Sequence, residues 1–299
     1  MLLKKSHSEN AKAIGFMVFG MLGFAGMDAL GKWIMGTDHS AFQLIAIKSW
    51  IVIVTMAIWI FVTGRLSQLK TNRPGSHVVR ILLSFSGPIL MLIALAQMPL
   101  ADVTVIVFSS VFITTALSFP VFKEKVGLHR WLAVVFGFVG VIIALKPGME
   151  VFQPAGILAL LAGAAFATIN LTTRWLKNTE TEISLIFYTI LGMAMLSSLM
   201  LPFVWKPMSF FDFSVYSLMG VFTLIGYIGV TKAFMRAPLG VVAPFEYTLM
   251  LFAVVSGYFI WGDLPDVSIW TGAAIIVASG LYLIYRETRE IDGFKADIN

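Results

Sequence analysis

The stretch from Val103 to Phe122, VTVIVFSSVFITTALSFPVF, decides the fold because its 20 residues include no charged side chain. A hydrocarbon layer of about 30 Å is crossed by ~20 helical residues that each rise 1.5 Å. The charge-free stretches 81–101, 151–173 and 183–205 are as long. We therefore expect several membrane-spanning helices.

The composition of the whole chain agrees with this expectation. Of its 299 residues, 59% are hydrophobic and 12% are charged, whereas soluble domains average about 25% charged residues. The excess apolar surface must face lipid, which argues against the soluble enzyme classes. Cysteine is absent, so disulfides, thiolate metal sites and cysteine nucleophiles are excluded as well.

Ten apolar segments lie between the charged residues. They cover 13–35, 42–63, 78–97, 101–122, 130–146, 154–175, 183–205, 213–235, 239–261 and 267–285. The segment at 130–146 is the shortest, and its terminal Arg130 and Lys146 can extend to the membrane surface. The loops are too short for a catalytic domain, so we expect an all-α membrane protein with ten transmembrane helices.

The basic residues predict the orientation. With the N-terminus inside, 17 of the 21 Lys and Arg residues fall on the cytoplasmic side, as short cytoplasmic loops prefer. An even number of spans also returns the C-terminus to that side. Because these residues lie in short gaps and not on one soluble face, we expect a lipid bilayer around the chain and no nucleic-acid partner.

The two halves of the chain resemble each other. Residues 98–103, MPLADV, match 237–242, APLGVV, at an offset of 139, and the same offset relates Trp131 to Trp270. Residues 24–33, FAGMDALGKW, also resemble 166–175, FATINLTTRW. Chance could explain one such match between apolar strings, but it explains several matches in the same order much less readily. Each half has five spans, an odd number, so we expect two inverted five-helix repeats, the plan of many secondary transporters.

This pattern predicts four parts of the chain. They are a cytoplasmic tail (1–12), a first repeat (13–146), a second repeat (147–286) and a second cytoplasmic tail (287–299). A basic start before an apolar run is also typical of a cleaved signal peptide. The first segment has a counterpart later in the chain and no clear cleavage site, which favours a retained helix.

The chain resembles the EamA-type transporters of the drug/metabolite transporter superfamily over residues 12–286. The resemblance rests on Pro-Leu-Ala-Asp at 99–102, Lys-Glu-Lys at 123–125, Trp131 with Gly137 and Gly140 before 146–147, and APFEYT at 243–248 before Gly262 and Asp263. It implies a ten-helix carrier in the bacterial inner membrane, with both termini cytoplasmic and a central cavity built from both repeats. Asp263 replaces the more usual Glu at a rim position, to which we assign no function.

Charged residues inside spans are the main candidates for function, because a charge at the bilayer centre costs about 2.5–3.5 kcal/mol on insertion scales. Asp28 and Lys32 are four residues apart on one helix face and have the favourable order for an ion pair. Lys48 lies at a similar depth to Asp28, so these two are also expected to pair. Glu246 lies nearer the cytoplasmic side, at the height of Arg80. We expect two polar layers that flank a cavity; structural ion pairs are the alternative.

Aromatic residues add a weaker signal, because rings line cavities and attract cations but more often pack or lie in the interfacial belt. The predicted substrate-binding or coupling residues are Asp28, Lys32, Trp33, Lys48, Arg80, Asn170, Tyr227, Glu246 and Tyr247. Gly140 and Gly272 offer small surfaces for close helix contact, either within the chain or in a homodimer.

Several expected signals for other chemistry are missing from the sequence. The four histidines are widely separated, so no metal site is predicted. No G-x-x-x-x-G-K-[ST] loop is available for nucleotide phosphates. We expect no catalytic residues and no cofactor.

The leading prediction is a secondary carrier, not an enzyme. It would move a small polar or zwitterionic metabolite, amino-acid-like or nucleoside-like, by alternating access, with a proton or a counter-solute as coupling partner. The alternatives are a passive channel and a membrane enzyme or lipid-head-group handler.

Overall fold

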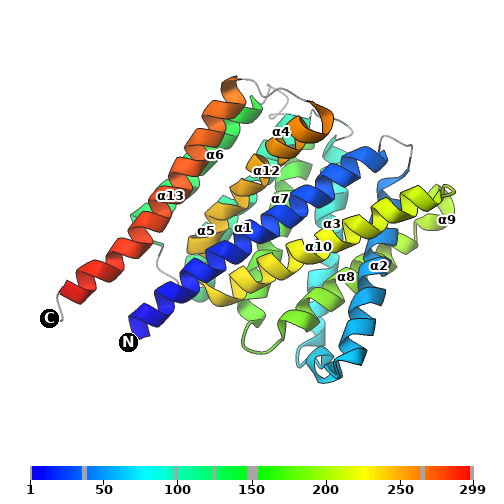
Figure 1. Cartoon of the computed structure of the whole chain (residues 1–299), viewed down its shortest axis with the longest axis horizontal. Coiled ribbons are helices and arrows are strands. Elements are labelled where there is room, and N and C mark those ends of the chain that lie inside the picture. Colours follow the sequence, from blue (N-terminus) through cyan, green and yellow to red (C-terminus); the bar gives the residue numbers. More distant parts are fainter. Residues whose placement is uncertain are drawn as a thin grey trace.

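The computed structural model describes residues 2–35, 39–95, 97, 100–123, 126–146, 154–262 and 267–296, and this part of the chain is a helical bundle (Figure 1). Its α-helices are α1 (Leu2–Met35), α2 (Ala41–Val62), α3 (Pro74–Leu95), α4 (Leu100–Val107), α5 (Ser109–Phe122), α6 (Leu128–Leu145), α7 (Pro154–Leu176), α8 (Glu182–Ser198), α9 (Leu201–Val204), α10 (Phe210–Arg236), α11 (Leu239–Val242), α12 (Thr248–Ser256) and α13 (Val267–Ala296). Two 3₁₀ turns, η1 (Leu66–Leu69) and η3 (Ala243–Tyr247), and a π turn, η4 (Gly257–Trp261), complete the described elements.

Five stretches of the described residues are long and apolar enough to cross a membrane. They are Glu9–Gly31, Ala41–Val62, Pro154–Leu176, Phe210–Arg236 and Leu239–Ile260. Shorter apolar helices cover Ser109–Phe122, Leu128–Ala144, Glu182–Ser198 and Val267–Leu283. The all-helical membrane class expected from hydropathy is therefore confirmed.

Two of the predicted spans, 101–122 and 239–261, are interrupted. The first divides at Phe108 into α4 and α5, and the second passes from α11 through η3 into α12. Pro244 in η3 has no amide hydrogen to continue an α-helix. Pro88 and Pro120 differ, because α3 and α5 continue past them.

The helices pack in a reciprocal pattern. α1 lies along α10 and α7 lies along α3, while α6 pairs with α13 and α2 with α8. α1 also contacts α12, and α7 contacts α4 and α5. A pseudo-twofold exchange of the first five spans with the last five would produce these same pairs.

Glycines allow the closest helix contacts. A Cβ atom on Gly229 of α10 would lie 2.5 Å from the Cα of Gly20 in α1, so a larger residue would push the two helices apart. On α6, a Cβ on Gly140 would lie 2.8 Å from the carbonyl oxygen of Gly272 in α13. This contact assigns the small surface at Gly140 and Gly272 to packing within the chain.

The two chain ends mark one side of the bundle, which we call the terminal side (Figure 1). Arg236 at the end of α10 lies over the ring of Phe16 in α1 and pairs with Glu182 at the start of α8. The connections 63–73 and 177–181 are joined by hydrogen bonds near this end. The opposite side is called the far side below.

Candidate functional site

Arg80 is a buried cation in the interior of α3. It is 2% exposed and lies six residues after Pro74, about 9 Å into the helix. Its Nη1 donates to the carbonyl oxygen of Ile169 at 3.1 Å and to the hydroxyls of Thr172 and Thr173 at 2.8 and 2.7 Å. All the acceptors of Arg80 among the described residues are neutral, so its charge lacks a carboxylate partner there.

The local geometry of α7 explains how the hydroxyls accept from Arg80. Thr172 and Thr173 both donate their hydroxyl hydrogens back to the carbonyl oxygen of Ile169, at 2.8 and 2.9 Å. This common bond in helices leaves the hydroxyl lone pairs available. Thr189 of α8 provides a further, longer contact with Nη2 of Arg80 at 3.5 Å.

Glu246 contacts the same turn of α7. Asn170, which is 8% exposed, donates from Nδ2 to Oε1 of Glu246 at 2.9 Å. Glu246 is half-buried and lies in η3, where the ninth predicted span is interrupted. The fold thus brings together three predicted site residues, Arg80, Asn170 and Glu246.

Tyr227 of α10 completes this group. It interacts electrostatically with Arg80, and its hydroxyl lies 3.2 Å from Sδ of Met193. The ring of Tyr227 meets the ring of Phe24 edge-on, with 5.5 Å between the centroids. We call Arg80, Asn170, Tyr227 and Glu246, with their threonine partners, the Arg80 cluster.

A second pair of charges lies nearer the far side. Lys48 is 7% exposed and seven residues after Ala41, about 10 Å into α2. Its ammonium attracts the carboxylate of Asp28 in α1 and also donates to Sδ of Met27 at 3.0 Å. A thioether is a weak acceptor, so Asp28 is the main compensation for this cation. Asp28 and Lys48, which were expected to lie at a similar depth, therefore interact electrostatically.

The remaining predicted residues lie outside these two groups. Lys32 belongs to α1, but its side chain is outside the described part of the structure. Trp33 is 48% exposed and lies against Phe211. Tyr247 is fully buried, with its ring edge against Phe108 at 5.6 Å between the centroids. Trp33 is thus an exposed aromatic residue, and Tyr247 is a core aromatic residue. Their roles in substrate binding or coupling stay predictions.

Sequence reasoning missed the neutral part of the site. Thr172, Thr173 and Thr189 contact Arg80, and the sulfur atoms of Met27 and Met193 contact Lys48 and Tyr227. A search for charged residues inside spans does not find hydroxyls or thioethers. One signal for these neutral partners was present in the sequence: a single span contains the polar residues Asn170, Thr172 and Thr173.

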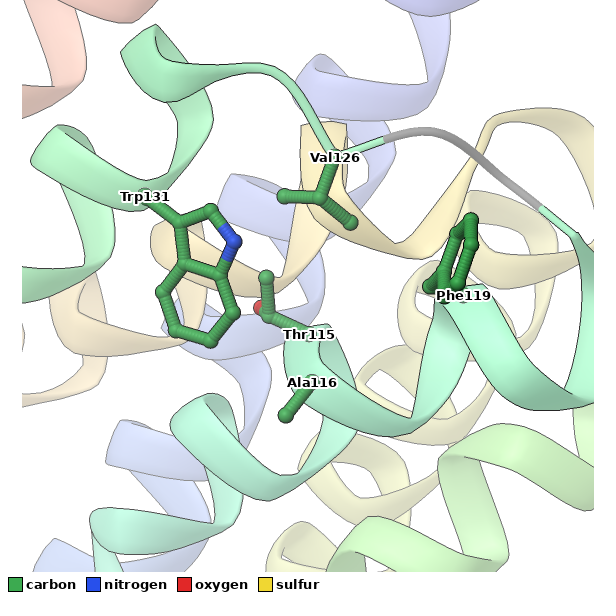
Figure 2. A pocket seen from close by; sticks show the side chains of 5 residues that line it. All are labelled: Thr115, Ala116, Phe119, Val126 and Trp131. Carbon is green, nitrogen blue, oxygen red and sulfur yellow. The ribbon is translucent and has the colours of Figure 1, made fainter.

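A lateral pocket between α5 and α6 is separate from both groups. Its volume is about 460 Å³, and it is lined by Thr115, Ala116, Phe119, Val126 and Trp131. Figure 2 shows the rings of Trp131 and Phe119 on opposite sides of the pocket. None of these side chains is charged, so the lining offers no counter-charge for a zwitterion.

Comparison with known proteins identifies relatives along most of the chain. Residues 11–146 match the EamA-like transporter family. An S-adenosylmethionine uptake transporter of Rickettsia felis is 28% identical over 276 residues, which cover 92% of this chain and 93% of the relative. A riboflavin transporter of Vibrio cholerae is 28% identical over 244 residues, which cover 80% of this chain and 81% of the relative.

One solved crystal structure has the same fold as this chain. Its TM-score is 0.74 at 15% sequence identity, and the match covers 88% of this chain and 95% of that chain. This likeness concerns the fold alone. Together with the apolar helices and the transporter relatives, the family match leads to one conclusion: the chain is a multi-pass membrane transporter of small metabolites that is related, over residues 11–146, to the EamA-like transporter family.

Proposed function

We propose that this protein is a secondary carrier for a small zwitterionic metabolite of the amino-acid or nucleoside type, with S-adenosylmethionine as the first candidate. The observation that carries the proposal is the buried guanidinium of Arg80, whose acceptors among the described residues are all neutral. An uncompensated buried cation is costly, and a substrate carboxylate would provide the missing charge. Guanidinium and carboxylate groups match each other in two parallel hydrogen bonds.

Glu246 is suited to the positive end of the same substrate. Its carboxylate receives the amide of Asn170, and no Lys or Arg of the described residues forms an ion pair with it. S-adenosylmethionine bears a carboxylate, an ammonium group, a sulfonium group and an adenine ring. Arg80 would bind the carboxylate and Glu246 a cationic group. The neighbouring rings of Tyr227 and Phe24 provide aromatic surface for the adenine.

The architecture of this carrier would be two inverted five-helix repeats, 13–146 and 147–286. The reciprocal helix pairs and the interruption of both the fourth and the ninth span support this plan. The family match also ends at 146, where the first repeat is proposed to end. Rocking of such repeats about a central site is the usual basis of alternating access.

The proposed location is the bacterial inner membrane with both termini in the cytoplasm. The excess of Lys and Arg in the loops of one side supports this orientation, as does the position of both chain ends on the same side of the bundle. The terminal side would then be cytoplasmic. The Arg80 cluster would lie toward the cytoplasm and the Asp28–Lys48 pair toward the outside.

The Asp28–Lys48 pair is proposed as the coupling site. Asp28 lies within α1 and is exposed, and a carboxylate at such a depth requires water or a solute beside it. A proton or a counter-solute that binds there would change the attraction between Asp28 and Lys48. The energy would come from an ion or exchange gradient, because the sequence has no loop for nucleotide phosphates.

Uptake of radiolabelled S-adenosylmethionine into proteoliposomes that contain the purified chain tests the proposal. We expect saturable uptake, acceleration by unlabelled substrate on the opposite side, and strong loss in Arg80→Gln. A proton gradient applied with and without a protonophore tests the coupling. Absence of saturable uptake, with correctly inserted protein, would contradict the substrate proposal.

The same assay distinguishes the alternatives. Riboflavin in place of S-adenosylmethionine would be taken up if the chain shares the substrate of its other relatives. Flux that does not saturate and shows no counterflow would indicate a passive channel. Chemical conversion of the solute or of a lipid head group without net flux would indicate an enzyme.

A further inference from the structure

Glu180 is a buried carboxylate that joins the two halves of the chain on the terminal side. Its side chain is fully buried, although it lies in the short connection between α7 and α8. Thr71 donates its hydroxyl to Oε1 of Glu180 at 2.9 Å, and the backbone amide of Asn72 donates to the same oxygen at 3.0 Å. Nε2 of His77 lies 3.1 Å from Oε2. These three groups come from the first half of the chain, and the hydroxyl of Ser184 in α8 adds a bond to Oε2 at 3.2 Å from the second half.

Neighbouring hydrogen bonds strengthen this junction. The hydroxyl of Thr181 donates to the carbonyl oxygen of Gln68 at 2.7 Å, and the hydroxyl of Tyr188 donates to the carbonyl oxygen of Leu69 at 2.9 Å. The ring of Tyr188 also packs on the ring of His77, with 4.7 Å between the centroids. The start of α3 is thus attached to the α7–α8 connection by several bonds.

The charge of Glu180 is well compensated in this position. Burial would raise the pKa of Glu180, but the hydrogen bonds from His77, Thr71 and the amide of Asn72 lower it below its usual value. The nearby Glu182 differs, because it is partly exposed and pairs with Arg236 at 3.1 Å. The two carboxylates therefore provide a matched pair for experiments.

The junction lies one helical turn from the proposed substrate site. His77 and Arg80 are three residues apart on α3 and share one face of that helix. Their partners also share two helices, because Glu180 joins the ends of α7 and α8 while Arg80 contacts Thr173 on α7 and Thr189 on α8. Displacement of the start of α3 would therefore move Arg80 away from its hydroxyl acceptors.

We infer that Glu180 is a positioning residue that holds Arg80 in place for the carboxylate of the substrate. The inference rests on the proposed function of Arg80. Glu180 acts through His77 and the start of α3 and does not touch the substrate itself. Loss of its charge is expected to weaken recognition of the carboxylate end more than recognition of the rest of the molecule.

A thiol next to Arg80 tests the inference without any substrate. The chain has no cysteine, so Thr172→Cys creates a unique thiol at a partly buried position that contacts Nη1 of Arg80. A nearby cation stabilises the thiolate, so modification by a small methanethiosulfonate reagent should begin at lower pH. Adding Arg80→Gln should shift the pH of half-maximal rate upward, which calibrates the probe.

Glu180→Gln in this background should shift the midpoint of the pH–rate curve in the same direction as Arg80→Gln, whereas Glu182→Gln should leave it in place. An unchanged midpoint in Glu180→Gln, with the calibration shift present, would overturn the inference. If the thiol is shielded in every background, thermal melts of Glu180→Gln, Arg80→Gln and the double variant decide. Additive effects would then overturn the inference, and non-additive effects would support it.

Transport kinetics extend the test to function. Glu180→Gln is expected to raise the KM for S-adenosylmethionine about tenfold, with a smaller change for the decarboxylated compound. Equal changes for both compounds would contradict the positioning role. If the wild-type chain does not transport S-adenosylmethionine but the thiol midpoint shifts in Glu180→Gln, the substrate proposal fails and the positioning of Arg80 by Glu180 stands.

Discussion

The two groups of intramembrane charges differ in how each charge is compensated. Asp28 and Lys48 attract each other between α1 and α2, so each of these two charges has an opposite charge nearby. Arg80 and Glu246 contact the same turn of α7 but meet neutral groups there. Opposite charges that already attract each other are typical of packing or coupling, whereas charges held by neutral groups remain able to bind a charged solute.

The largest expected effect is that of Arg80→Gln on uptake. Loss of a buried, hydrogen-bonded charge partner for the substrate should reduce Vmax/KM by roughly 100-fold or more. Arg80→Lys should restore only part of the activity, because an ammonium group does not offer the two parallel bonds of a guanidinium. Proteoliposome uptake, normalised to inserted protein, provides the measurement. Wild-type kinetics in Arg80→Gln would remove Arg80 from recognition and erase the contrast between the two groups.

Glu246→Gln is expected to have the next largest effect. The amide keeps the shape and a hydrogen bond to Asn170 but removes the negative charge, so KM for a cationic zwitterion should rise about tenfold. Uptake as a function of substrate concentration measures this change. Asn170→Ala is a control that leaves the charge in place. Unchanged transport in Glu246→Gln with normal membrane insertion would exclude Glu246 from the mechanism.

The Asp28–Lys48 pair should respond differently, because each residue compensates the other. Asp28→Asn and Lys48→Gln should each destabilise the protein. The double variant should recover part of the lost stability, with an interaction energy between the two residues of about 1 kcal/mol. Thermal melts in detergent measure the stability. Uptake driven by a proton gradient in the same variants tests whether the pair couples transport to protons. Strictly additive stability changes would mean that the two charges do not act as a pair.

The smallest expected effect is the pH dependence of stability at Glu180, in the junction that lies one helical turn from Arg80. Because its folded-state pKa is lowered, its contribution is fully present above the usual glutamate pKa of about 4.3 and is lost as the pH falls through the lower folded value. The difference in melting temperature between wild type and Glu180→Gln should therefore be greater at pH 7 than near pH 3. In Glu182→Gln, whose ion pair is partly exposed, the difference should be small throughout. A constant difference for Glu180→Gln would contradict the buried network.

Much of the fold could be predicted from the sequence, because hydropathy depends on continuous runs of residues. The run at 103–122 was recognised as a span, but its division at Phe108 was not, since no proline or glycine marks the break. The break at 243–247 had such a signal in Pro244. The charged members of the site were also predictable, because a charge inside an apolar span is costly wherever the helix packs.

The partners of these charges were only partly predictable. Depth along the helices indicated that Asp28 and Lys48 lie at a similar level, and the two interact electrostatically. It also indicated that Glu246 lies at the height of Arg80. It did not indicate that a turn of α7 lies between them. The role of Glu180 had no sequence signal, because its position in a polar connection is typical of a solvated residue.

The sequence alone determined that this chain is a multi-spanning membrane protein, because span length and hydropathy are properties of local runs. Tertiary structure decided which charge meets which partner. The acceptors of Arg80 lie 89 to 109 residues away along the chain, and helix packing brings them to it. Whether a buried charge is neutralised by the protein or left for a substrate depends on that packing, because electrostatic compensation acts over a few ångströms and not along the sequence.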